Sequence, residues 1–219
     1  ESTVTFPNWS PSSPDTVDVK VNTFLSGDAN PANDDVAQQT WLARAYYTGG
    51  PDGDNYFWID SDTTGGPTYS WIDITTSGTT VSFTSTDDGY ATIPIGFNFS
   101  YYNATQTNIN VYTNGYLNFG SIYSTLSNYT IPTAGGPENY IALAMDDLHT
   151  VAAGRVKYQL FGTSPNRYLV ISYDNIRWYN MGDDSLSLQA ILYETSNDIV
   201  VQYKKTFTNH GSRDNGMQA

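Results

Sequence analysis

The stretch Ile109-Asn-Val-Tyr-Thr-Asn-Gly-Tyr-Leu-Asn-Phe119 decides the fold. Apolar residues occupy alternate positions on both sides of its central Asn114-Gly115 pair, and that pair can take the positive φ angles of a tight turn. Alternation around such a turn predicts an antiparallel β-hairpin with one inward face. Leu117 and Phe119 are therefore expected to be buried.

Short runs rich in Val, Ile, Thr and Tyr surround this hairpin, and clusters of Gly, Pro, Asn and Asp separate them. Because almost no 3.6-residue periodicity accompanies these runs, the chain is predicted to be all-β. Two stacked antiparallel sheets, a β-sandwich of the jelly-roll or immunoglobulin-like type, would satisfy every run. Further strands are predicted at residues 91–97, 140–144, 156–161, 168–173, 186–193 and 199–203. The first residues of 186–193 are expected to be half-exposed, and its end covered on both faces.

Composition narrows the class of protein. The chain has 219 residues, and its 9 Lys and Arg against 22 Asp and Glu give a net charge of −13, which excludes nucleic acids and anionic membranes as partners. Aromatic residues make up 15% and charged residues only 14%, as in an extracellular β-protein. Cysteine is absent, and no apolar stretch is long enough for direct membrane insertion. We expect a mature or excised piece of an extracellular or cell-surface protein.

Residues 1–46 differ from the rest of the chain. They hold two strand-like runs, residues 16–21 and 36–45, which cannot bury a core by themselves. They are interpreted as the last strands of an immunoglobulin-like repeat, or as an extension that pairs with the main domain in cis or with a neighbouring chain in trans. The Gly- and Pro-dense residues 47–55 mark the boundary. The expected domains are residues 1–46, a sandwich over 47–206 and a polar tail over 207–219.

Three segments together resemble a known module. They are Asp88-Gly-Tyr-Ala-Thr-Ile-Pro-Ile-Gly-Phe-Asn-Phe-Ser-Tyr-Tyr102, then Val111 to Phe119, then Ile141-Ala-Leu-Ala-Met-Asp-Asp147. This pattern resembles the nidogen-like module, although Leu143 stands where that pattern prefers proline. Residues 28–205 share the resemblance, and 54–73 look like the stretch that precedes the module in large secreted bacterial multidomain proteins, among them surface proteins and gingipain-like peptidases. The resemblance implies an accessory role beside varied partners.

Catalytic groups are scarce in the sequence. There are two histidines, His149 and His210, three glutamates, and none of the motifs of zinc hydrolysis, α/β-hydrolase chemistry or nucleotide binding. No pair of carboxylates stands out as the acid and base of a glycosidase. We therefore expect no enzyme. Aspartates are the best chemical signal, because their hard oxygen ligands suit Ca²⁺ when sandwich loops bring them together. The favoured cluster is Asp52, Asp54, Asp60 and Asp62; the pairs at 87–88, 146–147 and 183–184 are further candidates.

Aromatic side chains supply the other candidate site. Trp178 and Tyr179, placed in an expected loop, and the pair Tyr101 and Tyr102 are interpreted as a platform on which sugar rings could stack. Core packing is the competing interpretation of the same residues. If the host glycosylates, Asn103 and Asn128 are the expected acceptors.

The expected function is a non-catalytic structural, assembly or adhesion module of a larger secreted or cell-surface protein. Two alternatives stay open: a carbohydrate- or protein-binding accessory module of a secreted enzyme, and a subunit of an extracellular filament joined by strand donation. The expected partners are neighbouring domains, copies of the same protein, or glycans.

Overall fold

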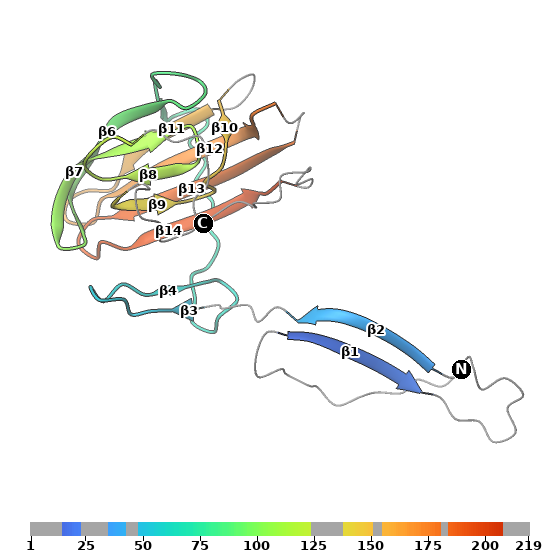
Figure 1. Ribbon diagram of the computed structural model, residues 1–219. Coiled ribbons are helices and arrows are strands. Elements are labelled where there is room, and N and C mark those ends of the chain that lie inside the picture. The colour runs from blue at the N-terminus through green and yellow to red at the C-terminus, as the bar shows by residue number, and fades with distance from the viewer. Residues whose placement is uncertain are drawn as a thin grey trace, which may run out of the picture. The chain divides into compact units, whose positions relative to one another are not determined.

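A computed structural model describes residues 15–22, 35–42, 48–123, 138–150, 155–180 and 184–207. These residues form strands and turns without any helix, and the strands pair in antiparallel sheets (Figure 1). The prediction of an all-β sandwich is therefore confirmed. The chain divides into two compact units, residues 1–67 and 68–219, so the division lies later than the predicted boundary after residue 46.

The N-terminal unit contains two short antiparallel ribbons. Strands β1 (Asp15–Asn22) and β2 (Asp35–Leu42) pair along their whole length, from Asp15 opposite Leu42 to Asn22 opposite Asp35. The two strand-like runs of the sequence thus pair with each other. Strands β3 (Thr48–Gly49) and β4 (Trp58–Ile59) form a second, two-residue ribbon.

One sheet of the sandwich contains the hairpin that the sequence predicts. Its strands lie in the order β6 (Tyr90–Tyr101), β7 (Ala104–Tyr112), β8 (Tyr116–Asn118) and β9 (Tyr140–Ala142). Gly115 has a φ of 72° in the turn, and both Leu117 and Phe119 are buried, so the predicted hairpin is confirmed. Asn110 and Asn118 are buried as well, which strict alternation does not predict.

The second sheet holds six strands. Its order is β14 (Ile199–Lys205), β13 (Ser185–Tyr193), β12 (Tyr168–Trp178), β11 (Arg155–Phe161) and β5 (Thr79–Thr80), and β10 (Leu148–His149) also pairs with β12. Strand β12 runs five residues beyond its predicted end, because a bulge between Tyr173 and Ile176 lets the pairing with β13 resume. The expectation that Trp178 lies in a loop is therefore wrong.

The two sheets pack face to face through apolar side chains. Alternate residues of β6 point inward and are buried, as are Ile171 and Leu188 of the opposite sheet. Polar bonds add to this contact: the Tyr173 hydroxyl donates to the Tyr112 carbonyl at 2.8 Å. Burial raises the pKa of that Tyr173 hydroxyl, which keeps it a neutral donor.

A segment that precedes β5 covers the outer face of the six-stranded sheet. We call residues 68–78 the strap. Its Ile74 is buried against Val170 and Ile191, with Ile72 packed beside them. Strand β13 is consequently buried on both faces along nearly its whole length, so the expectation that it begins half-exposed is wrong.

Candidate functional site

A row of polar side chains crosses the outer face of the six-stranded sheet. Lys157, Ser172, Gln189 and Gln202 occupy consecutive paired positions on β11, β12, β13 and β14. Three of these four side chains bond to the main chain of the strap. The row therefore binds the strap by its main chain. The strap itself pairs with none of the described strands before β5.

Two glutamines bind the strap as a neighbouring strand would. The side chain of Gln202 accepts from the Ser70 N–H at 2.6 Å and donates to the Ser70 carbonyl at 2.9 Å. Gln189 makes the same pair of bonds with Ile72, both at 3.0 Å. Because an amide side chain carries a donor and an acceptor, it can satisfy both main-chain groups of one residue. We call these four bonds the glutamine clamps.

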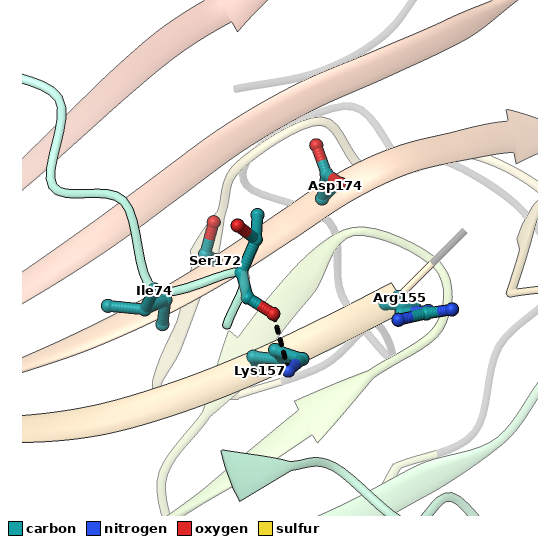
Figure 2. A pocket seen from close by; sticks show the side chains of 6 residues that line it. Ile74, Arg155, Lys157, Ser172 and Asp174 are labelled. Atoms are coloured by element: carbon teal, nitrogen blue, oxygen red, sulfur yellow. Dashed lines mark hydrogen bonds between the residues drawn. The ribbon is translucent and has the colours of Figure 1, made fainter. Parts of the chain in front are cut away.

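Beside the last turn of the strap lies a cavity of about 80 Å³ (Figure 2). Its lining combines two cations, one carboxylate, two hydroxyl side chains and one apolar wall: Arg155, Lys157, Asp174, Ser172, Thr75 and Ile74. The Lys157 ammonium donates to the Thr75 carbonyl at 2.7 Å and to the Gly78 carbonyl at 3.3 Å. No local sequence pattern predicts this cavity, because the cavity depends on where the strap lies.

The predicted aromatic platform does not form around Trp178. Its side chain is 3% exposed, its ring stacks on Phe207 with 3.9 Å between centroids, and its indole N–H donates to Asp146 at 2.9 Å. Tyr179 is exposed beside His149. The core interpretation of Trp178 is thus correct, and Phe207 belongs to the sandwich rather than to the predicted polar tail.

The second aromatic pair is divided in the same way. Tyr101 is buried against Phe119, and its hydroxyl donates to the Tyr140 carbonyl at 2.9 Å. Tyr102 is exposed at the turn between β6 and β7, in edge contact with Tyr101. The interpretation of Tyr101 and Trp178 as ligand contacts is therefore wrong, since neither offers a ring face to a ligand.

The favoured calcium cluster is used in turns instead. One carboxylate oxygen of Asp52 accepts from the N–H groups of Asp54 and Tyr56, and one of Asp60 accepts from those of Asp62 and Thr63. Such bonds are the usual way in which aspartate fixes a turn. Among the residues that the structure describes, Asp52, Asp54, Asp60 and Asp62 do not converge within one metal-sized group.

Carboxylates converge elsewhere, where two loops of the sandwich meet. Ligand oxygens of Asp87, Asp88 and Asp147 lie within 4.8 Å of one another. The Asn114 amide donates to Asp88 at 2.9 Å, and Asp87 forms a main-chain bridge with His149. Two of the further aspartate pairs in the sequence thus contribute to one site, which sequence spacing could not show because they lie far apart along the chain.

Asp87 is the unusual member of this cluster. One of its carboxylate oxygens, Oδ1, is buried without a hydrogen-bond partner among the described residues. Burial, and then the negative charges of Asp88 and Asp147, raise the pKa of Asp87 above its usual value. Each of the three residues thus offers a carboxylate oxygen, which is a hard ligand atom for a cation.

The two expected glycosylation acceptors are Asn103 and Asn128. Asn103 is exposed at the turn between β6 and β7, with a φ of 61°. Asn128 lies outside the described residues.

Comparison with known proteins gives one match. A family model described as NIDO related matches residues 61–219, which covers the strap and the whole sandwich. No curated protein and no solved structure matches the chain. Within the described ranges, no helix has the length and apolar character to span a membrane.

Proposed function

Since the chain belongs to the NIDO-related family, we propose that it is a non-catalytic structural and adhesive module of a larger extracellular or cell-surface protein. In this proposal the parent is a secreted bacterial multidomain protein, and β1 and β2 are the last strands of a preceding immunoglobulin-like repeat. The nidogen-like module then works as a linking unit between neighbours.

The observation that carries this proposal is the bond between the strap and the final strand. Ser70 lies two residues into the sandwich unit, and Gln202 lies on β14, its last described strand. Their two hydrogen bonds therefore join the incoming chain directly to the outgoing chain. Tension along the polypeptide would load the glutamine clamps together, before it reaches the sheet interface.

Single-molecule pulling of the full chain between its two termini tests this role. We expect one discrete unfolding peak for the sandwich, and a lower peak force when Gln202→Met and Gln189→Met remove the clamps. Gln159→Met is the matched control, because among the described residues its side chain bonds to the exposed Ser77 hydroxyl and not to the main chain of the strap. A sandwich that opens gradually, or clamp variants that unfold at the wild-type force, would contradict the proposal that the module transmits tension between its neighbours.

A second candidate function is a filament joined by strand donation. In the described part of the chain β14 pairs only with β13, so one edge of the six-stranded sheet is open, and β1 with β2 forms a ribbon of only two strands. Open edges accept further strands. Light scattering of the full chain over a range of concentrations tests this candidate: assembly that depends on residues 1–46 supports it, and a monomer at every concentration excludes it.

We also propose that Ca²⁺ binds the carboxylates of Asp87, Asp88 and Asp147. The unsatisfied oxygen of Asp87 supports this proposal, because a buried carboxylate oxygen without a partner is costly until a cation or donor meets it. A bound ion would fix the loop before β6 to the loop before β10, and so stiffen one end of the sandwich.

A further inference from the structure

We propose that the cavity beside the strap binds a carboxylate group, with the Ser172 hydroxyl and the Lys157 ammonium as its donors. This site is separate from the proposed linking role. It would let the module attach to a ligand that carries a carboxylate with a hydroxyl one or two carbons away, such as a uronic acid unit of a glycan or a free hydroxy acid.

Ser172 is the first reason. Its side chain lines the cavity, the residue is 3% exposed, and its hydroxyl oxygen is not among the buried unpaired atoms of the described residues, so the hydroxyl faces the cavity. Its neighbours in the polar row, Gln189 and Gln202, are fully engaged by the strap. A hydroxyl is both a donor and an acceptor. Ser172 therefore has a donor and acceptor left for whatever occupies the cavity.

Lys157 is the second reason, because its charge is already held in place. Two carbonyls of the strap, from Thr75 and Gly78, accept two of its three ammonium protons, and Figure 2 draws one of these bonds as a dashed line from Lys157. The third proton is free for a ligand. Ser172 lies directly opposite Lys157 in the pairing of β11 with β12, so both donors serve the same small volume.

The charge of the lining selects an anion. Arg155 lies two residues before Lys157 on the same face of β11, at the edge of the cavity, with no ion pair in the described ranges. Only nine cationic side chains exist in this chain of net charge −13, and two of them line this cavity. A local pair of cations attracts an anion that the molecule as a whole repels.

Asp174 adds a preference for a neighbouring hydroxyl. It lies opposite Arg155, and its two carboxylate oxygens accept from the Ser187 hydroxyl and the Asn175 amide, both at 3.2 Å. A carboxylate has further lone pairs after such bonds, so it can still accept a hydroxyl of the ligand. With Asp174 included, the lining carries two cations and one carboxylate, so its net charge of about +1 favours a ligand with a single negative charge.

The size of the cavity sets how much of the ligand enters. A cavity of about 80 Å³ is small, and it suits a carboxylate and the carbon that bears it while most of a sugar ring remains at its mouth. The wall formed by Ile74 would contact that carbon. The rest of the ligand would stay outside, where the exposed strap and Arg155 border it.

Amide-resolved NMR titration of the full chain tests the proposal with three probes: sodium galacturonate, sodium glycolate and neutral galactose. We expect saturable shifts at Thr75, Lys157 and Ser172 with an acidic probe and none with galactose. Saturation with galacturonate alone would show that the ligand is an acidic sugar. Saturation with glycolate alone would show that it is a small hydroxy acid. Equal shifts with galactose, or no saturable shift with either acid, would overturn the proposal.

Variants separate specific binding from general charge. Ser172→Ala and Arg155→Gln should each weaken binding of the acidic probe by about tenfold, the usual effect of losing one hydrogen bond to a charged group. Lys20→Gln removes the same charge as Arg155→Gln at a residue that does not line the cavity, so it should leave the affinity unchanged. Wild-type affinity in both cavity variants would show that the carboxylate binds elsewhere and would overturn the assignment.

Discussion

Arg167 and Glu194 form a two-pronged ion pair between the residue before β12 and the residue after β13. One guanidinium N–H meets a Glu194 oxygen at 2.5 Å, and the Nε–H meets the other oxygen at 2.8 Å. The same guanidinium donates to the Gly96 carbonyl of β6 at 2.7 Å. One side chain thus ties two strand ends to each other and to the opposite sheet.

This pair predicts how stability responds to acid. The hydrogen bonds from Arg167 lower the pKa of Glu194 from its usual 4.5 to about 2. Because the folded state holds the charged form more tightly, the contribution of Glu194 is present above pH 4.5 and is lost as the pH falls through about 2. Thermal unfolding at a series of pH values should show a smaller acid loss in Glu194→Gln than in the wild type. Identical slopes in the two proteins would contradict this role.

A side chain at position 115 should destabilise the fold. Its φ of 72° disfavours a β-branched residue, and an added Cβ would lie 2.4 Å from the Ala144 carbonyl oxygen. Gly115→Val should lower the free energy of unfolding by on the order of 1 to 2 kcal/mol for the backbone alone, and further because of that contact. Gly120→Val is the control, since Gly120 has a φ of 94° but open space around it. If urea unfolding shows that both variants lose the same free energy of unfolding, the whole effect comes from the backbone conformation and not from the contact with Ala144.

Calcium should stabilise the sandwich through the loops that hold Asp87 and Asp147. At a hundred times its Kd a bound ion adds about 2.7 kcal/mol, which raises the melting temperature by several degrees. Asp87→Asn with Asp147→Asn should abolish the rise. Asp52→Asn with Asp54→Asn, in the turn that the sequence favoured, should leave it intact. A melting curve that is the same in calcium and in chelator would show that no ion binds.

A chain that begins at Tyr46 should fold as the longer chain does. The ribbon of β1 and β2 belongs to the N-terminal unit, whereas the strap and the sandwich lie in the other. Circular dichroism and thermal melting of the shortened chain should match those of residues 1–219. Loss of the melting transition would mean that residues 1–45 complete the sandwich.

Local patterns predicted the strands and the central hairpin. The runs that become β11, β13 and β14 are recognisable because each strand is rich in apolar and β-branched residues. The turn is recognisable because Asn114 and Gly115 are adjacent in the sequence. The strap was missed for the opposite reason. Its bonds come from Gln189 and Gln202, more than a hundred positions away, and nothing near Ser70 marks it.

The candidate sites show the same limit. The sequence predicts a loop at Trp178, after Tyr173-Asp-Asn-Ile-Arg177, yet β12 continues past a bulge and Trp178 is buried against Phe207. The acidic pairs at 87–88 and 146–147 were visible as separate signals. Their meeting depends on how two loops close over one end of the sandwich, and that geometry has no local pattern.

The bonding of Asn114 also affects how the protein ages chemically. An asparagine before glycine is where chains commonly deamidate, through attack of the following main-chain nitrogen on the side-chain carbonyl. Here the Gly115 N–H is bonded to the Tyr112 carbonyl, and the Asn114 side chain accepts from the Leu148 N–H and donates to Asp88. The attacking nitrogen and its target are thus both held, so this Asn-Gly bond should deamidate more slowly than Asn-Gly bonds in flexible loops.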